Sequence, residues 1–172
     1  MTPRRWLLHS LGLIAMIGGM PVAKAAGPLG KPTGKVILTI SGKIKNTNHG
    51  EVAEFDREML EALGMTSIQT ATPWYSTVMT FEGVPMAKLL EVVGAFGTEV
   101  TALALNDYST TIPANDFETH KVILALKRNG EYMPVSDKGP LFIIYPFDSN
   151  PELKQQKYYS RAAWQVARLV VK

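Results

Sequence analysis

Four short segments of the sequence combine aromatic rings with polar or charged side chains, each at the edge of an apolar run. Together they hold tryptophan and tyrosine rings, an amide, carboxylates and a guanidinium. Such a set suits a flat heterocycle of the guanine or pterin type, whose N–H edge donates to a carboxylate, whose carbonyl accepts from a cation, and whose faces stack on aromatic rings. The alternative is that these rings are half-buried core residues with locally satisfied polar atoms. The segments are 72–75, 106–108, 147–148 and 158–161.

The composition gives little support to thiolate catalysis, metal catalysis or a serine hydrolase mechanism. The chain has no cysteine, which excludes thiolate catalysis and cysteine-ligated metals. Beyond the first 25 residues only His49 and His120 remain, and neither lies among carboxylates at ligand spacing. No nucleophile-elbow pattern supports a serine hydrolase triad.

The N-terminal segment is predicted to be an export signal. Arg4 and Arg5 precede an uncharged apolar run, and Ala23-Lys24-Ala25 offers a small-x-small cleavage site. An uncleaved anchor is the alternative, but the run is shorter than the ~20 residues that a membrane helix needs. We therefore expect a signal peptide at 1–25, a flexible leader at 26–34, and one domain at 35–172 that is periplasmic.

Cleavage would change the charge of the protein. The whole chain has 18 basic and 15 acidic residues, but Arg4, Arg5 and Lys24 lie in the leader, so 18 − 3 = 15 basic residues remain and the formal net charge is zero. A neutral domain gives no reason to expect nucleic-acid binding.

The remaining pattern predicts an α+β domain with mixed, mostly antiparallel sheets and a few short helices. The run 141–145, with breakers on both sides, predicts a strand buried on both faces, and Asn129-Gly130 predicts a hairpin turn. Residues 146–159 are expected to be loop. Helices are expected at 52–63, 85–93 and 116–120, and the other strands at 35–41, 66–72, 80–84, 99–105, 109–112, 122–126, 132–135 and 164–171.

Several motifs resemble the molybdopterin-binding domain family that has the sulfite oxidase fold, over about residues 35–172. The motifs are Pro-Trp at 73–74, Phe-Glu-Gly-Val-Pro-Met-x-x-Leu-Leu at 81–90, Leu-Asn-Asp-Tyr at 105–108, Asp-Lys-Gly-Pro-Leu at 137–141, Tyr-Pro-Phe-Asp at 145–148 and Tyr-Ser-Arg-x-x-Trp-Gln-Val at 159–166. The last two resemble its small, exported, cysteine-less branch of periplasmic pterin-binding regulatory proteins.

The resemblance also implies two losses. Catalytic members bind molybdenum through a cysteine, and Thr70 is expected at that position, with Thr72 as the alternative. A threonine hydroxyl is a poor substitute for a thiolate on molybdenum. Catalytic relatives also tend to have an arginine where this chain has Phe142, so a cation near the cofactor phosphate is expected to be missing.

We therefore expect a non-catalytic protein that binds a reduced pterin, has no redox cofactor or metal, and signals to the periplasmic domain of an inner-membrane protein that controls cyclic-di-GMP turnover. The alternatives are a molybdenum-cofactor-dependent oxidoreductase of the sulfite oxidase type and an interaction scaffold with a vestigial pocket. The expected ligand-binding residues are Trp74, Asn106, Asp107, Tyr108, Lys138, Phe147, Asp148, Tyr159, Ser160 and Arg161.

Overall fold

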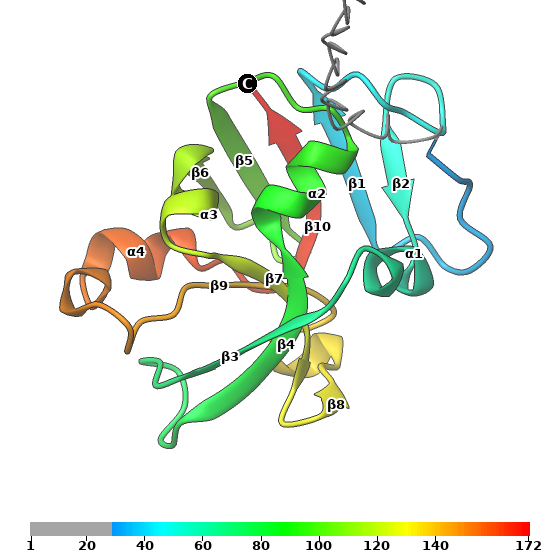
Figure 1. Cartoon of the computed structure of the whole chain (residues 1–172). Coiled ribbons are helices and arrows are strands. Elements are labelled where there is room, and N and C mark those ends of the chain that lie inside the picture. Colours follow the sequence, from blue (N-terminus) through cyan, green and yellow to red (C-terminus); the bar gives the residue numbers. More distant parts are fainter. Residues whose placement is uncertain (1–28) are drawn as a thin grey trace, which may run out of the picture.

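Strand β10, the last strand, pairs with β1, the first strand, in the first of two sheets (Figure 1). It pairs in parallel with β1, so that Ile40 lies opposite Leu169, and antiparallel with β5. The strand order is β2-β1-β10-β5-β6. The bounds are β1 Leu38–Gly42, β2 Ala53–Phe55, β5 Glu99–Ala104, β6 Ser109–Pro113 and β10 Val166–Val171.

The second sheet is centred on strand β7, which pairs with β4 on one side and with both β8 and β9 on the other. The β7–β8 turn contains Asn129 and Gly130, both at positive φ, as the hairpin prediction requires. The bounds are β3 Thr66–Thr70, β4 Met79–Pro85, β7 Ile123–Arg128, β8 Glu131–Tyr132 and β9 Phe142–Ile144.

The helices are short. Figure 1 shows α2 over one face of the first sheet, and α3 and α4 near its β6 edge. The bounds are α1 Arg57–Ala62, α2 Met86–Val92, α3 Asn115–Thr119 and α4 Gln156–Arg161, with single 3₁₀ turns η1 Val135–Asp137 and η2 Pro151–Leu153. No helix in residues 29–172 is long and apolar enough to cross a bilayer.

This computed structural model describes residues 29–172, so the predicted signal peptide and the first residues of the leader lie outside the described part. Within it, the α+β class with mixed, mostly antiparallel sheets is confirmed. The run 141–145 is fully buried, as predicted. One edge of β9 pairs with β7, and on the other edge the Ile143 N–H donates to the Ala163 carbonyl at 2.9 Å.

Several local predictions were wrong. The helix expected at 52–63 begins only at Arg57, because the Asp56 side chain caps it by accepting from the Met59 N–H at 2.9 Å, and Phe55 belongs to β2. The strand expected at 132–135 ends at Tyr132. The loop expected at 146–159 contains η2 and the start of α4.

Candidate functional site

An aromatic cavity lies where three distant segments meet: the loop after β3, the β5–β6 turn, and α4 with the residues that follow it. Its volume is about 310 Å³, near the lower end of the roughly 300 to 1,000 Å³ typical of ligand pockets. Rings, amides and a hydroxyl line it together. The lining residues are Pro73, Trp74, Asn106, Tyr108, Gln156, Tyr159, Ser160, Ala162 and Trp164.

Trp74 is the fixed wall of this aromatic cavity. Its ring meets Trp164 edge-on, with centroids 5.5 Å apart, and Tyr159 edge-on at 6.1 Å. Behind it, the fully buried Phe142 and Phe147 lie 5.4 Å and 6.2 Å away. Edge-to-face contacts of this kind hold aromatic rings in one orientation. The cavity therefore has a wall that the core has already positioned.

Polar contacts close the cavity on the side of the β5–β6 turn. The Tyr108 hydroxyl donates to the Ser160 carbonyl at 2.7 Å, which joins the turn to α4. The Asn106 side-chain oxygen accepts from the Tyr108 N–H at 3.2 Å. Among the described residues, the Asn106 amide N–H₂ group has no hydrogen-bond partner, so it remains available to a ligand.

A second cavity adjoins the first. It has a volume of about 330 Å³ and is lined by Trp74, Ser136, Asp137, Lys138, Trp164 and Gln165. Trp74 and Trp164 line both cavities. The two tryptophans thus lie between an aromatic cavity and a polar one.

The polar cavity borders a charged cluster. Asp137 lies 2.7 Å from the Arg128 guanidinium and accepts from the Tyr75 hydroxyl at 3.3 Å, and Arg128 also donates to Tyr75. The hydrogen bond from Arg128 lowers the pKa of Asp137, whereas burial raises the pKa of Tyr75. Lys138 lies 3.6 Å from Asp137, with its ammonium 4.5 Å from the Tyr75 ring centroid. Arg128 is therefore committed to Asp137, and Lys138 is the cation better placed to meet a ligand.

Six of the ten predicted site residues line these two cavities. They are Trp74, Asn106, Tyr108, Lys138, Tyr159 and Ser160. Phe147 lies beneath them in the core, 5.0 Å from the Tyr159 ring. The remaining three residues, Asp107, Asp148 and Arg161, line neither cavity.

Asp107 and Arg161, two of the predicted ligand-binding residues, therefore do not meet Trp74 at either cavity. Asp107 is exposed in the tight turn between β5 and β6. The turn requires a left-handed residue at this position, and Asp107 has a φ of 64°. The Arg161 guanidinium donates to Asp116 at 2.7 Å, and Tyr145 donates to the same carboxylate oxygen at 2.8 Å. Burial, followed by the charge of Asp116, raises the pKa of Tyr145.

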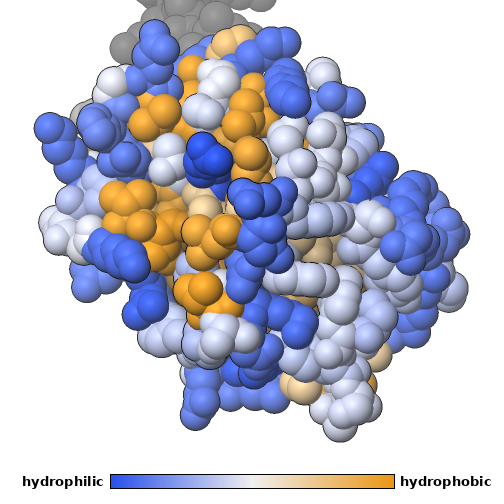
Figure 2. All heavy atoms as spheres, turned by 180° about the vertical axis from the view of Figure 1, so that it is seen from behind, coloured by the Kyte–Doolittle hydropathy of each residue, from blue (hydrophilic) through white to orange (hydrophobic). Residues whose placement is uncertain are grey.

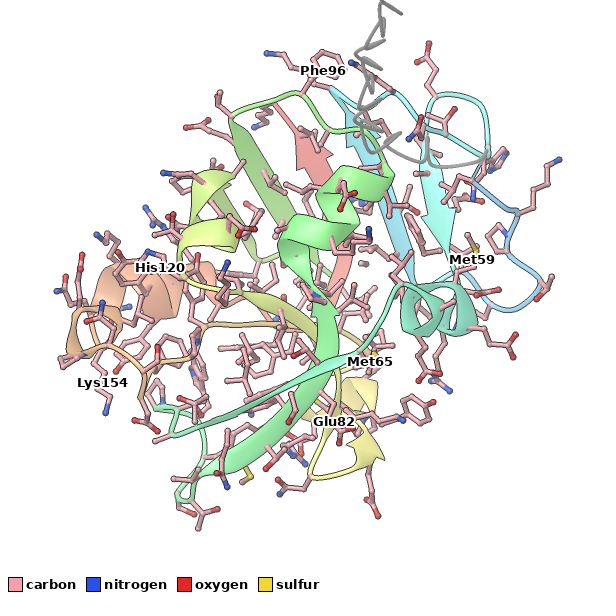
Figure 3. The ribbon with its side chains drawn as sticks, viewed as in Figure 1. Met59, Met65, Glu82, Phe96, His120 and Lys154 are labelled. Atoms are coloured by element: carbon pink, nitrogen blue, oxygen red, sulfur yellow. The ribbon has the colours of Figure 1, made fainter. Side chains whose placement is uncertain are left out.

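Asp148 anchors the start of the loop that carries Trp74. Its carboxylate accepts from the Ala71 N–H at 2.6 Å and pairs with Lys154 at 2.6 Å, and these contacts lower its pKa. Its own N–H donates to the Thr70 hydroxyl at 3.1 Å. Figure 3 shows Lys154 on the segment before α4. Asp148 thus joins the end of β3 to the segment after β9 instead of facing a ligand.

Several residues that line the two cavities were not predicted from the sequence. Trp164 was assigned to the last strand, although it belongs to the quoted motif at 159–166 and β10 begins only at Val166. Gln156 was placed in a loop because α4 has no side-chain cap to mark its start. His120, at the end of α3, packs edge-on against Tyr158 at 5.2 Å, beside α4 (Figure 3), and not in either cavity.

Comparison with known proteins adds the family. A model of the oxidoreductase molybdopterin binding domain matches residues 36–148. The chain belongs to this family. The match ends before α4, so the part of the aromatic cavity formed by Gln156, Tyr159, Ser160, Ala162 and Trp164 lies beyond it.

Among solved structures, the sulfane dehydrogenase SoxCD of Paracoccus pantotrophus is similar, with a TM-score of 0.58 and 20% identity. The alignment covers 78% of this chain and 37% of that one. At this identity the similarity shows the shared fold, and this chain spans little more than a third of the dehydrogenase chain. No curated protein matches the sequence.

The donors in this family member do not fit a molybdenum centre. Thr70 is fully buried at the end of β3, and its hydroxyl is engaged by the Asp148 N–H and the Ala71 carbonyl. Thr72, the alternative position, has a buried hydroxyl without a partner in the described residues. Residues 29–172 also contain no cluster of three histidine, cysteine, aspartate or glutamate side chains that could hold a metal. Neither threonine lines the aromatic cavity, and neutral hydroxyls are weak ligands for this metal.

Proposed function

We propose that this member of the molybdopterin-binding domain family binds a reduced pterin without metal and without catalysing a reaction. The observation that supports the proposal is the contrast between two parts of the site. Six predicted ligand-binding residues surround two adjoining cavities. Thr70, the residue expected at the metal position, is instead fully buried, and its hydroxyl is hydrogen-bonded to the Asp148 N–H and the Ala71 carbonyl.

The lining of the aromatic cavity suits the two kinds of surface of a pterin. The rings of Trp74, Tyr108, Tyr159 and Trp164 offer faces and edges to a flat bicyclic ring. Within the described residues, the Asn106 amide N–H₂ group and the Gln156 side-chain oxygen make no hydrogen bond. The first can donate to the carbonyl of a pterin, and the second can accept from its amino or ring N–H groups. Lys138, across the tryptophans, suits an electron-rich substituent.

We assign no carboxylate to the pterin, since Asp137, the one carboxylate that lines the two cavities, is paired with Arg128. Asp107 and Asp148 were expected to accept from the N–H edge, but the first is exposed in a turn and the second is paired with Lys154. Recognition by amides is weaker per hydrogen bond than recognition by a charged group. We therefore propose binding in the micromolar range and not tighter.

The proposed setting is the periplasm, with the periplasmic domain of an inner-membrane protein of cyclic-di-GMP turnover as the partner. The predicted export signal at 1–25 and the resemblance of the motifs at 145–148 and 159–166 to pterin-binding regulatory proteins support it. In this scheme, the protein reports pterin supply to the membrane protein.

A second candidate is an oxidoreductase that uses the molybdenum cofactor. The family match over residues 36–148 favours it. The donor set opposes it, since the chain has no thiolate and Thr70 is engaged within the core.

Elemental analysis separates the two candidates. The protein is produced in a host that makes the molybdenum cofactor, purified, and analysed for molybdenum and for pterin released on denaturation. We expect metal far below one atom per chain, and any released pterin in excess over the metal. One molybdenum atom per chain would overturn the proposal in favour of the oxidoreductase.

A further inference from the structure

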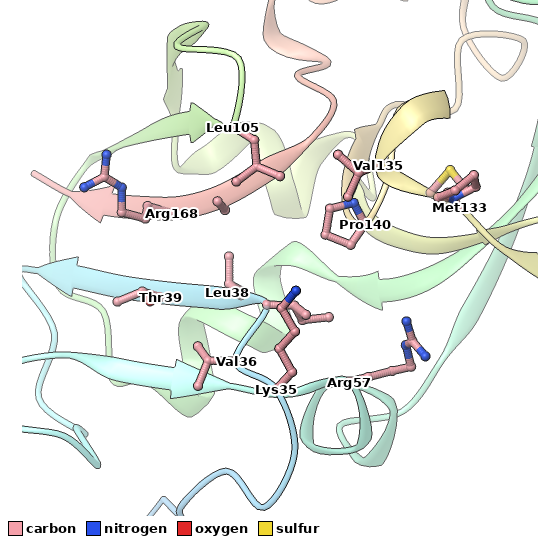
Figure 4. A pocket seen from close by; sticks show the side chains of 13 residues that line it. Lys35, Val36, Leu38, Thr39, Arg57, Leu105, Met133, Val135, Pro140 and Arg168 are labelled. Atoms are coloured by element: carbon pink, nitrogen blue, oxygen red, sulfur yellow. The ribbon is translucent and has the colours of Figure 1, made fainter.

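A groove separate from the pterin site lies between the first sheet and the segment around η1 (Figure 4). Its volume is about 460 Å³. Three of the exposed large hydrophobic residues line it: Val36, Leu105 and Val135, which are 37%, 54% and 50% exposed. Figure 2, seen from behind, shows hydrophobic residues gathered on one face with hydrophilic residues around them. Exposed apolar side chains gathered in one hollow often mark an interaction site.

The charged residues that line the groove are all basic. Lys35, Arg57 and Arg168 line it, and none of its lining residues is acidic. Within residues 29–172, none of these three cations forms an ion pair with a carboxylate; Arg57 instead lies 4.1 Å from the Tyr132 ring centroid. In a domain with a formal charge of zero after residue 25, three unpaired cations around an apolar hollow are complementary to an anionic, partly apolar partner.

The placement of the cations limits the kind of occupant. They come from three separate elements: the segment before β1, the start of α1, and β10. A fatty acid carries a single negative charge, which cannot neutralise three cations. A bilayer is flat, whereas the apolar side chains line a concave surface. A polypeptide carries several carboxylates between apolar side chains and can satisfy all three cations.

The backbone of the groove is not free to extend the sheet. Strand β1 is paired on both sides, with β2 and β10, and Thr39 lies opposite Arg168 in this pairing. A bound segment must therefore be recognised through side chains and not by strand addition.

We propose that this groove binds a segment of a partner protein in which apolar side chains alternate with or adjoin carboxylates. The apolar side chains of the segment contact Val36, Leu105 and Val135, and its carboxylates pair with Lys35, Arg57 and Arg168. The proposal does not depend on a pterin, and it gives the protein a docking surface whichever ligand occupies the aromatic cavity.

Peptide selection tests the inference. Random peptides displayed on phage are selected on the immobilised protein, and the enriched sequences are synthesised with a fluorophore for anisotropy. Two matched pairs of variants are compared: Val135→Ser in the groove against Val78→Ser, which is 53% exposed elsewhere, and Lys35→Glu against the exposed Lys43→Glu. Circular dichroism and thermal unfolding establish that all four variants fold, and pterin titration of each establishes that the other site is unchanged.

We expect peptides rich in Asp and Glu beside Leu, Ile, Val or Phe. Their affinity should fall about tenfold or more in the two groove variants, change less than about twofold in the two controls, and fall with salt. Failure to enrich peptides, enrichment of acid-free peptides, or equal losses in groove and control variants would overturn the inference. Sedimentation of the protein with vesicles of anionic phospholipid, lost in the groove variants, or binding of laurate in place of peptide, would assign the groove to lipid and also overturn it.

Discussion

The Arg161 guanidinium lies 2.7 Å from the Asp116 carboxylate, an ion pair that joins the end of α4 to α3. Both side chains are largely buried, 19% and 10% exposed, and the Tyr145 hydroxyl donates to the same oxygen. This pair fixes the helix whose Tyr159 and Ser160 line the aromatic cavity. Arg161 therefore positions the site from behind instead of contacting a ligand.

Replacing this arginine should reduce stability more than binding. Arg161→Ala leaves the Asp116 carboxylate poorly solvated and without its cation, which should lower the free energy of unfolding by about 2 to 4 kcal/mol. Tyr145→Phe keeps the ion pair and should cost about 1 kcal/mol. Urea unfolding measures both. An Arg161→Ala protein with unchanged stability but lost pterin binding would show that the arginine contacts the ligand after all.

The two buried threonines at the end of β3 and just beyond it should respond in opposite ways to the same substitution. Thr72→Val removes a hydroxyl that has no partner and should stabilise the fold by up to about 1 kcal/mol. Thr70→Val removes the acceptor of the Asp148 N–H and should destabilise it by about 1 kcal/mol. Thermal and urea unfolding of the pair give the answer. Equal effects would mean that the Thr72 hydroxyl is solvated or bonded.

The anchor at Asp148 should make stability depend on pH. Hydrogen bonding by the Ala71 N–H, with the contribution of Lys154, lowers the pKa of Asp148 below its ordinary 3.8 in the folded protein. A lowered folded-state pKa adds stability above that ordinary value, and this stability is lost as the pH falls through the folded-state pKa. The melting temperature of wild type should exceed that of Asp148→Asn at pH 7, and the difference should shrink from pH 4 downward.

A suitable control for this experiment is Asp107→Asn. The Asp107 carboxylate makes no hydrogen bond or ion pair with the described residues, and asparagine also tolerates its positive φ. A difference between wild type and Asp148→Asn that stayed constant from pH 7 to pH 2 would contradict the anchoring role of the Asp148 charge.

Trp164 should matter for ligand binding although it was not among the predicted site residues. Because it lines both cavities, Trp164→Ala should weaken pterin binding about tenfold or more, in line with the roughly 1 to 3 kcal/mol that stacking of a base on an aromatic side chain contributes. Tyr132→Ala, an exposed aromatic residue outside both cavities, is the control. Calorimetric titration of the two variants measures the effect. Equal affinities would contradict a contact between Trp164 and the pterin.

The sequence was most informative where a local signal dominates. Pro85 before the apolar positions of α2, and Asn129-Gly130 between β7 and β8, predicted these elements close to where they lie. Phe55 was placed in a helix because its spacing from Met59 fits a helical face. The cap residue Asp56 between them, which ends the strand and starts α1, was the signal that could have corrected this.

The site was only partly predictable for a different reason. Trp74, Tyr108 and Tyr159 could be picked out from the sequence, because each stands in a short segment that combines aromatic and polar residues at the edge of an apolar run. The direction of a charged side chain depends on partners far away in the chain. Arg161 turns toward Asp116, 45 residues earlier, and Asp148 toward Ala71, 77 residues earlier, and neither pairing leaves a local sequence signal.

The most direct test of the account is calorimetric titration of the purified wild-type protein with a tetrahydropterin under anaerobic conditions, without added metal, alongside Trp74→Ala. We predict saturable binding of one pterin per chain in the micromolar range, weakened about tenfold or more in the variant. Absence of binding to wild type at high micromolar ligand, or equal binding by the variant, would contradict the claim that the aromatic cavity holds a flat bicyclic ring without molybdenum.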